Sequence, residues 1–192
     1  NVLEVVTYDQ LPTDKDGNKV RLWPTKFVRS IKRNSATNEN KGRSRLVVVG
    51  IHHREGKEYS RKDAPTPLFA SMLICIGEGT VRNGIKFQFD LAQYFQRTDC
   101  DSPEPICLIP PPRYQKNANG QKVYYISKKW LQGSKGAGYA ARQRLVSILM
   151  DNEYIKFTPT TFDKCLYTHS SSRGEARFTL HVDDGCGGWA SS

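Results

Sequence analysis

The sequence lacks the features that would place the chain in a membrane, in the secretory pathway or around a structural zinc ion. No apolar run approaches ~18 residues, and the first residues do not join a charged segment to an apolar one. The cysteines are odd in number, with no Cys-x-x-Cys pair and no histidine at zinc-finger spacing: Cys75, Cys100, Cys107, Cys165 and Cys186. We therefore expect no secretion, no membrane insertion and no disulfide framework, and a reducing compartment.

Acidic residues are also scarce relative to basic ones. The 192 residues include 29 Lys and Arg against 19 Asp and Glu, which gives a net charge of +10. Such an excess suits a polyanionic partner, because neutralised phosphates release their counterions, although a merely soluble basic protein would show the same balance. With 38% apolar and 10% aromatic residues, the chain can bury a core in one domain or in two lobes.

A basic β-hairpin is predicted in the first quarter of the chain. Val20–Ile31 alternates β-branched and aromatic residues with basic ones, and Arg43–Gly50 has the composition of a returning strand. The polar segment Asn34–Gly42 between them is expected to be a loop. The basic side chains of the two strands would line one face.

The rest of the chain mixes strands and helices without regular alternation. Leu68–Ile76 is apolar, but so short a run does not distinguish a helix from a strand. Ile85–Asp90 alternates as a strand does, and Gly138–Asn152 has the apolar spacing of an amphipathic helix. Lys164–His169 and Ala176–Val182 form a second predicted strand pair. Separate strands and helices of this kind predict an α+β fold.

Three carboxylates stand at the ends of predicted strands. Asp90 closes one strand, while Asp183 and Asp184 follow another and precede a flexible Gly185. If the two strands are neighbours, the carboxylates converge, and hard oxygen ligands of this kind hold Mg²⁺ ions for phosphoryl transfer. An Asp-Asp pair in a hairpin is more often turn chemistry, so both interpretations stay open on this pattern alone.

The neighbours of these carboxylates resemble the motifs of one enzyme family. Leu180–Asp184 (LHVDD) resembles the Y-V-D-D turn of reverse transcriptases, and Phe89–Phe95 (FDLAQYF) resembles their L-D-V-K-T-A-F block. Further blocks follow in the order of copia-type elements: Lys41–Val47, His53–Tyr59, Ala64–Pro67, Ile106–Tyr114, Gln132–Ala137 and Phe162–Tyr167. The chain thus resembles the reverse transcriptase of a copia-type (Pseudoviridae) LTR retrotransposon.

The resemblance implies a right-hand polymerase with fingers and palm subdomains and an antiparallel palm sheet flanked by helices. Residues 1–85 would be the N-terminal fingers with the basic hairpin, and 86–99 the palm strand with the first catalytic aspartate. Residues 100–130 would return to the fingers, and 131–192 would be the palm with the Asp-Asp turn. The thumb and RNase H parts of such a Pol polyprotein are expected to be missing, as in a fragment or a domesticated remnant.

The same resemblance implies that Asp90, Asp183 and Asp184 are the catalytic, metal-binding triad, with the backbone carbonyl of Leu91 as a further ligand. The cofactor would be Mg²⁺, or Mn²⁺, which activates the primer 3′-hydroxyl and neutralises the incoming triphosphate. The implied partners are an RNA template, a DNA primer and deoxynucleoside triphosphates. The implied location is intracellular, in a cytoplasmic virus-like particle or in the nucleus.

Four residues would contact the nucleotide by this resemblance. Arg43 and Arg45 would reach the triphosphate, Phe95 would exclude a ribose 2′-hydroxyl, and Lys135 would lie near template or nucleotide phosphates. Each residue also has a structural interpretation. The arginines would then be a solvated strand face, Phe95 a core aromatic and Lys135 a solvated lysine at a helix start.

Two adjacent histidines, His52 and His53, invite a metal or proton-transfer role. Neither stands at ligand spacing from a second His or Cys, so both are predicted to be surface loop residues.

Four positions depart from the family pattern: His181 stands for Tyr, Tyr94 for Ala, Gly136 for Gln and Gly138 for Pro. A phenol at 94 would crowd the nucleotide sugar, and loss of the glutamine removes a nucleotide or template contact. A non-catalytic nucleic-acid-binding module is therefore the alternative function. A third hypothesis is an unrelated basic α+β protein, such as a ribosome-associated component, in which Asp90 would lie far from Asp183.

Overall fold

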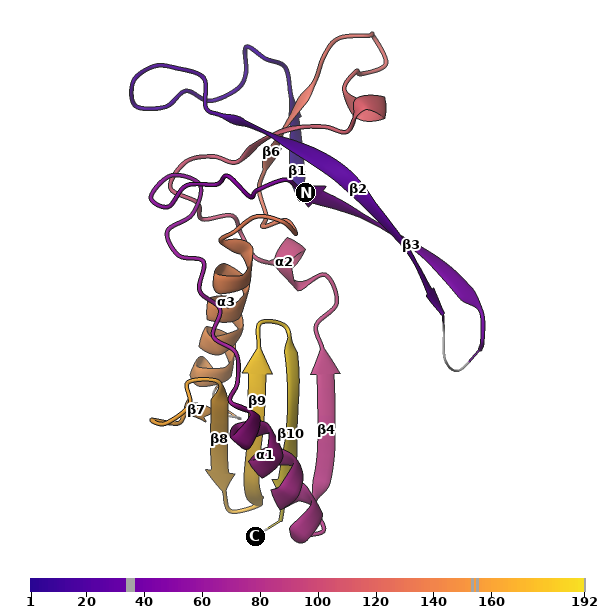
Figure 1. Ribbon diagram of the computed structural model, residues 1–192. Helices are drawn as coiled ribbons and strands as arrows, with labels where there is room; N and C mark the ends of the chain where they lie inside the picture. The colour runs from indigo at the N-terminus through magenta and orange to yellow at the C-terminus, as the bar shows by residue number, and fades with distance from the viewer. Residues whose placement is uncertain (34–36, 153, 155, 192) are drawn as a thin grey trace. The chain divides into compact units, whose positions relative to one another are not determined.

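The computed structural model describes residues 1–33, 37–152, 154 and 156–191. Within them the chain forms two compact units, each with one five-stranded sheet (Figure 1). Unit 1 comprises Asn1–Lys62 and Phe95–Ala137, and unit 2 comprises Asp63–Tyr94 and Gly138–Ser192. The α+β class predicted from the sequence is confirmed, whereas the division into fingers and palm stays a prediction.

Unit 1 is built on a sheet with the strand order β1-β6-β5-β2-β3. Its elements are β1 (Leu3–Val6), β2 (Leu22–Arg33), β3 (Asn40–Val48), β5 (Cys107–Ile109), the 3₁₀ turn Pro112–Tyr114 and β6 (Tyr124–Ser127). The pair β2 and β5 is parallel, and the other pairs of this sheet are antiparallel. Buried apolar side chains from β1, β5, β6 and the first loop form a core there: Val6, Leu11, Val20, Cys107 and Tyr124.

The predicted basic hairpin is confirmed as the antiparallel pair β2 and β3. Strand β3 begins at Asn40, inside the segment predicted as a loop, of which residues 34–36 lie outside the described part of the chain. The prediction of a single basic face is only partly right, because side chains alternate across a strand. One face carries Lys26, Lys32, Lys41, Arg43 and Arg45, and the other carries Arg29 and Arg33.

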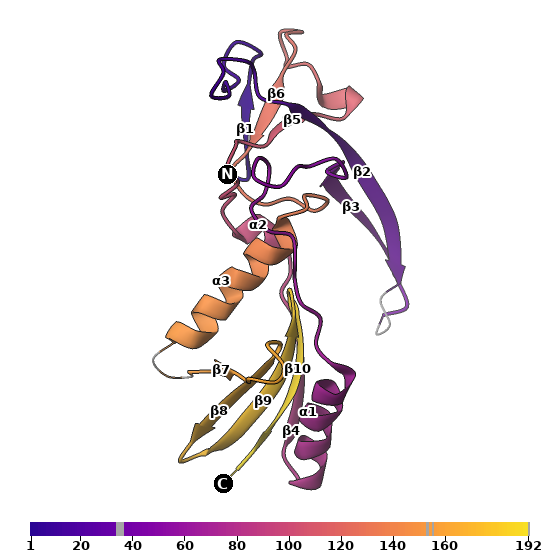
Figure 2. The same cartoon turned by 60° about the vertical axis from the view of Figure 1, so that its left-hand side comes forward.

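Unit 2 is built on an antiparallel sheet with the strand order β4-β10-β9-β8-β7. Its strands are β4 (Ile85–Asp90), β7 (Thr158–Pro159), β8 (Leu166–Ser171), β9 (Gly174–His181) and β10 (Asp184–Ala190). Its helices are α1 (Phe69–Val81) and α3 (Ala137–Asp151). The short α2 (Tyr94–Arg97) begins at the last residue of this segment of unit 2 and otherwise belongs to unit 1. Figure 2 shows α1 and α3 on opposite sides of this sheet.

The predictions for unit 2 are largely confirmed. Strand β4 has the predicted bounds, α3 begins one residue early, and β8 with β9 forms the predicted pair. The ambiguous run at 68–76 is a helix that continues to Val81. On one face of the sheet, aromatic rings gather around the buried Phe178: Phe87, Phe89, Phe157 and Tyr167.

The other face of the sheet receives α1 through small side chains. The buried residues of α1 are Ser71, Cys75 and Gly79, one turn apart. A Cβ atom added to Gly188 of β10 would lie 2.8 Å from the Cys75 carbonyl oxygen and 3.2 Å from the Gly79 Cα. The backbones of helix and strand therefore touch, and only glycine fits at 188.

Replacing Gly188 with Ala is expected to destabilise the chain by about 1–3 kcal/mol, because α1 must move away from β10. The matched control is Gly77→Ala in the same helix, where an added Cβ meets nothing within 4 Å. That variant should be neutral or stabilising by up to about 1 kcal/mol, since alanine is the better helix former. Urea unfolding of the three proteins measures both effects, and equal midpoints for Gly188→Ala and wild type would contradict the close packing.

Candidate functional site

A tight turn joins β9 to β10 at the predicted Asp-Asp pair. His181 pairs with Asp184, so Val182 and Asp183 are the two turn residues. Val182 has φ 55°, a left-handed conformation that β-branched residues rarely adopt. Its side chain is buried, which holds the turn in place against a strain of about 1–3 kcal/mol. Strain of this kind is typical of sites that position functional groups.

The three predicted aspartates lie close together in the backbone at this end of the sheet. Asp184 is the direct cross-strand partner of Asp90, and the Leu91 amide donates a hydrogen bond to the Asp183 carbonyl oxygen (3.1 Å). Asp90 and Asp184 are exposed, and Asp183 is half-buried. The hypothesis of an unrelated protein with Asp90 far from Asp183 is therefore wrong.

The electrostatics of the turn leave negative charge uncompensated. Burial raises the pKa of the Asp183 carboxyl, and the negative charges of Asp184 and Asp90 raise it further. A backbone hydrogen bond within Asp183 and the nearby His181 act in the opposite direction on this pKa. A bound cation would relieve such repulsion between neighbouring carboxylates.

The donor chemistry of these carboxylates fits a hard divalent cation. Among the residues that the structure describes, however, no three His, Cys, Asp or Glu side chains are already arranged to hold a metal ion. Metal binding at Asp90, Asp183, Asp184 and the Leu91 carbonyl therefore stays a prediction, supported by charge and proximity.

Gly185, which follows the turn, serves packing rather than flexibility. A Cβ atom at this position would lie 2.2 Å from the Phe89 ring. The glycine thus lets the aromatic face of the sheet reach the carboxylate end. The sequence predicted a flexible glycine at this position, and the structure shows that the Phe89 ring leaves no room for a side chain there.

A cavity of about 360 Å³ opens beside the carboxylates. Asp184 and His181 line it together with Gln88, Thr179 and Cys186, which are cross-strand neighbours on β4, β9 and β10. Gln88 lies two residues before Asp90 and Cys186 two residues after Asp184. The two-residue period of a strand could have identified both residues from the sequence.

The four predicted nucleotide-contact residues all belong to unit 1. Arg43 and Arg45 are exposed on β3, and neither guanidinium has a partner among the described residues. Phe95 is half-buried in α2. Lys135 donates a hydrogen bond to the His53 carbonyl oxygen (3.2 Å) and lies 6.0 Å from the Tyr59 ring centroid, so it is held rather than freely solvated.

The prediction for His53 is wrong. Its side chain is only 3% exposed and packs edge-on against Trp23, with ring centroids 4.3 Å apart. The turn in which the His53 amide bonds to the Gly50 carbonyl folds the imidazole inward. Both ring nitrogens lack a hydrogen-bond partner in the described part of unit 1, and burial lowers the His53 pKa. His52 is exposed, as predicted.

Two departures from the family pattern have structural explanations. Tyr94, which replaces a small residue, is buried with 6% exposure, and burial raises its pKa. At Gly136 an added Cβ would lie 2.6 Å from the Trp130 ring and 2.8 Å from the Tyr59 Cβ. These two aromatic residues occupy the space that a longer side chain at 136 would need.

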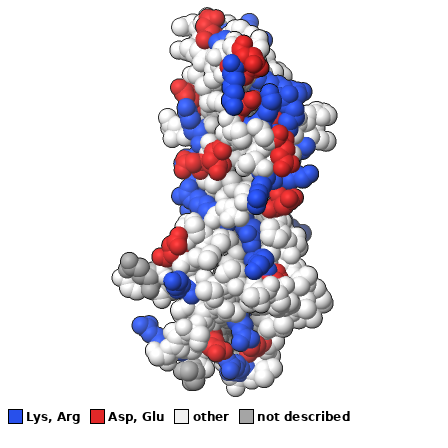
Figure 3. Space-filling model, turned by 90° about the vertical axis from the view of Figure 1, so that its left-hand side faces the viewer, with Lys and Arg blue, Asp and Glu red and all other residues white. Residues whose placement is uncertain are grey.

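The net positive charge of the chain lies in unit 1. By sequence this unit has 21 Lys and Arg against 10 Asp and Glu, whereas unit 2 has 8 against 9. On the face shown in Figure 3, charged side chains crowd over unit 1, and large areas of unit 2 are uncharged. The polyanion contact predicted from the net charge is therefore expected at unit 1.

Comparison with known protein families matches residues 7–186 to the family described as reverse transcriptase (RNA-dependent DNA polymerase). Neither a curated protein nor a solved structure matches the chain. In the described residues, no helix is long and apolar enough to span a membrane.

Proposed function

The chain belongs to the reverse transcriptase (RNA-dependent DNA polymerase) family, and on this premise we propose that it is the RNA-directed DNA polymerase of a copia-like retrotransposon. The observation that carries the proposal is the meeting of Asp90, Asp183 and Asp184 at one end of the unit 2 sheet. The proposed reaction joins the 3′-hydroxyl of a DNA primer to the α-phosphate of a deoxynucleoside triphosphate, and pyrophosphate leaves.

The carboxylates of Asp90 and Asp183 are the proposed metal ligands, with Asp184 beside them. Bound Mg²⁺ or Mn²⁺ supplies charge neutralisation and an activated 3′-hydroxyl. The strained Val182 turn holds Asp183 in place, and the hydrogen bond from the Leu91 amide keeps the Leu91 peptide next to the carboxylates. The Leu91 carbonyl is a proposed further ligand.

Unit 1 supplies the proposed contacts to template, primer and triphosphate. Arg43 and Arg45 have no partner among the described residues and present planar guanidinium groups that suit phosphate oxygens. Phe95 is the proposed selector against ribonucleotides, and Lys135 the proposed contact to a template or nucleotide phosphate.

The double variant Arg43→Ala, Arg45→Ala is expected to weaken binding to a poly(rA)/oligo(dT) duplex and to lower its salt dependence. Loss of two phosphate contacts should reduce the slope of log K against log salt by about 2. The matched control is Arg29→Ala, Arg33→Ala, which removes the same charge from the opposite face of the hairpin. Fluorescence anisotropy at several salt concentrations measures this slope. An equal loss of affinity in both double variants would contradict the proposal that one face of the hairpin binds the duplex.

The proposed activity is tested by thymidine incorporation on poly(rA) with an oligo(dT) primer, with and without Mg²⁺ or Mn²⁺. Metal-dependent incorporation supports the polymerase. The second candidate, a non-catalytic binding module, is favoured by the exposed basic hairpin. It predicts salt-dependent binding to the primed template without incorporation, also in a chain extended through a thumb.

A further inference from the structure

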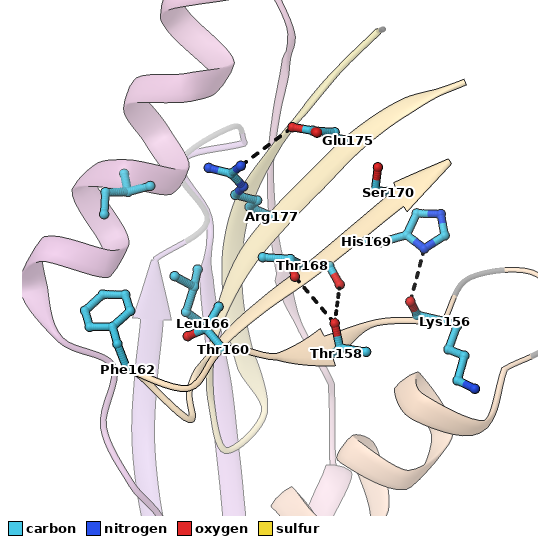
Figure 4. Close-up of a pocket in the computed structure, with 11 residues that line it drawn as sticks. Lys156, Thr158, Thr160, Phe162, Leu166, Thr168, His169, Ser170, Glu175 and Arg177 are labelled. Atoms are coloured by element: carbon cyan, nitrogen blue, oxygen red, sulfur yellow. Dashed lines mark hydrogen bonds and ion pairs between the residues drawn. The ribbon is translucent and has the colours of Figure 1, made fainter. Parts of the chain in front are cut away.

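His53 is a buried titratable residue that the proposed chemistry does not use. Its side chain is 3% exposed, and its ring lies edge-on against Trp23, with ring centroids 4.3 Å apart. Neither Nδ1 nor Nε2 has a hydrogen-bond partner among the residues that the structure describes. His169 in unit 2 shows the commoner arrangement, because it lines a cavity of about 760 Å³ and its Nδ1 lies 3.1 Å from the Lys156 carbonyl oxygen (Figure 4).

The protonation state of His53 decides what its unpaired ring costs. In a neutral imidazole one nitrogen is a donor and the other an acceptor, whereas both are donors in the protonated ring. Protonation would bury a positive charge and two donors without acceptors, and burial of an unpaired charge costs far more than burial of an unpaired polar group. The site therefore accommodates His53 as a neutral ring.

The ring lies at the base of the basic hairpin, where β3 ends. The His53 amide donates a hydrogen bond to the Gly50 carbonyl oxygen (3.0 Å), and a Cβ atom added to Gly50 would lie 3.0 Å from Cε1 of the ring. The same added atom would lie 2.4 Å from the Gly133 carbonyl oxygen. The Val48 amide of β3 in turn donates to the Gln132 carbonyl oxygen (2.8 Å). The imidazole is thus packed at the contact between the end of β3 and the segment before α3.

The backbone of His53 also anchors Lys135, the proposed contact to a template or nucleotide phosphate. The Lys135 ammonium donates a hydrogen bond to the His53 carbonyl oxygen (3.2 Å) and lies 6.0 Å from the Tyr59 ring centroid. A shift of His53 would therefore move both the base of the hairpin and this ammonium, all within unit 1.

The surroundings of His53 disfavour its protonation on balance. Burial lowers the His53 pKa below its usual 6.5, and the positive charges of Lys135 and Arg21 lower it further. The carboxylate of Glu58 acts in the opposite direction on this pKa. That carboxylate already accepts hydrogen bonds from the Arg54 amide (2.7 Å) and the Arg54 guanidinium (3.3 Å).

The stability of unit 1 should therefore depend on pH. Because the unfolded pKa of His53 is 6.5 and the folded pKa is lower, the folded chain loses stability as the pH falls below 6.5. For one proton the unfolding equilibrium constant rises by up to about tenfold per pH unit, and the rise ends once the pH is below the folded pKa.

We propose that His53 is a positioning residue of the nucleic-acid-binding surface: as a neutral ring it holds the base of the β2–β3 hairpin and Lys135 in place, and its protonation in mildly acidic solution releases both. This inference rests on the proposed function only in taking unit 1 to bind nucleic acid. It does not depend on the carboxylates of unit 2 or on polymerase activity.

The test uses the full chain at several pH values between about 7.5 and 5.5, within the range in which histidine titrates. Urea unfolding followed by tryptophan fluorescence measures the stability, and anisotropy with a labelled poly(rA)/oligo(dT) duplex measures the affinity. His53→Phe keeps a ring that cannot take up a proton, and His52→Phe, at the adjacent exposed position, is the matched control. Acidification should raise the unfolding equilibrium constants of wild type and His52→Phe about tenfold more than that of His53→Phe. Their affinity for the duplex should fall by a comparable factor relative to His53→Phe.

The imidazole resonances of the wild type provide a measurement that needs no substitution. The His53 ring should still be neutral at pH 6.5, where half of an unburied histidine carries a proton. A His53 ring that is protonated above pH 6.5, or equal pH profiles of stability for wild type and His53→Phe, overturns the proposal.

The affinity measurements distinguish a positioning role from a purely structural one. Acid-sensitive stability without a matching loss of affinity overturns the proposal, because His53 would then serve the fold alone. A wild type that does not bind the duplex at any pH refutes the nucleic-acid role of unit 1 and with it the positioning role. The stability profile would still show in that case whether protonation of His53 loosens the base of the hairpin.

Discussion

The Asp183→Asn variant is expected to lose metal-dependent DNA synthesis by about 10³-fold or more and to be at least as stable as the wild type. The loss follows from removal of a proposed metal ligand, since metal stabilisation of the transition state amounts to several kcal/mol and each 1.36 kcal/mol is tenfold in rate. Thymidine incorporation with saturating Mg²⁺ measures the activity, and urea unfolding measures the stability.

The stability expected of this variant follows from the sign of the pKa shift. Burial and the charges of Asp184 and Asp90 raise the pKa of Asp183 in the folded chain. Because the unfolded pKa of Asp183 is 3.8 and the folded pKa is higher, the folded chain loses stability as the pH rises above 3.8 and the carboxyl ionises. Asparagine stays neutral and avoids this cost at pH 7. Below the unfolded pKa the advantage of the variant should vanish.

The control is Asp151→Asn, which changes an exposed carboxylate at the end of α3. It should retain both incorporation and stability. Full incorporation by Asp183→Asn would refute its role as a metal ligand. A marked loss of stability would instead indicate that Asp183 serves the turn, as the alternative interpretation of the Asp-Asp pair holds.

The Asp163→Ala variant is expected to lose about 3 kcal/mol of stability, which is the largest structural effect anticipated for this chain. Asp163 is buried and ties the start of α1 to the loop before β8. One carboxylate oxygen accepts hydrogen bonds from the Leu68 amide and the Ser71 hydroxyl, and the other accepts one from the Cys165 amide (2.8 Å). The N-cap residue of α1 is Leu68, whose side chain cannot accept a hydrogen bond. Asp163, from a distant part of the chain, caps the helix instead.

The pH dependence of this contribution is opposite in sign to that of Asp183. Burial by itself would raise the pKa of Asp163, but hydrogen bonds from Ser71, Cys165 and Leu68 and the charge of Arg142 lower it overall. The stabilisation is therefore present above the unfolded pKa of 3.8 and is lost as the pH falls through the folded pKa. Urea unfolding at pH 7 and at several values below pH 4 measures the free energy of unfolding of both proteins. The difference between wild type and Asp163→Ala should become smaller as the pH falls.

The matched control for this prediction is Asp151→Ala, at an exposed position that should change stability by no more than about 0.5 kcal/mol. If the difference in unfolding free energy between wild type and Asp163→Ala stayed constant down to acidic pH, the ionised form of Asp163 would contribute nothing to stability. A loss below about 0.5 kcal/mol would contradict the capping role.

The sequence allowed much of the local structure to be predicted. The alternation of Ile85–Asp90 predicted β4 with its observed bounds, and the spacing of apolar residues predicted α3 to within a residue. The same patterns placed Asp90 and the Asp-Asp pair at strand ends. Such periodicities are local properties of the chain, which the backbone geometry of helices and strands translates directly into faces and ends.

Other features followed from contacts between distant segments. The apolar run at 68–76 became a helix whose small side chains fit β10, and its large ones stayed outside. His53 was predicted at the surface and is buried against Trp23. Neither outcome is encoded in a short window, because burial depends on which distant residues fill the neighbouring space.

The sequence by itself thus determined most of the element types, two hairpins and the family to which the chain belongs. Only the tertiary structure decided that β4 pairs with β10, which brings Asp90 opposite Asp184, and that Asp163 caps α1. It also decided that the net positive charge resides in unit 1. The physical reason is that side-chain period and turn chemistry act over a few residues, whereas strand pairing, charge grouping and burial depend on segments far apart in the chain.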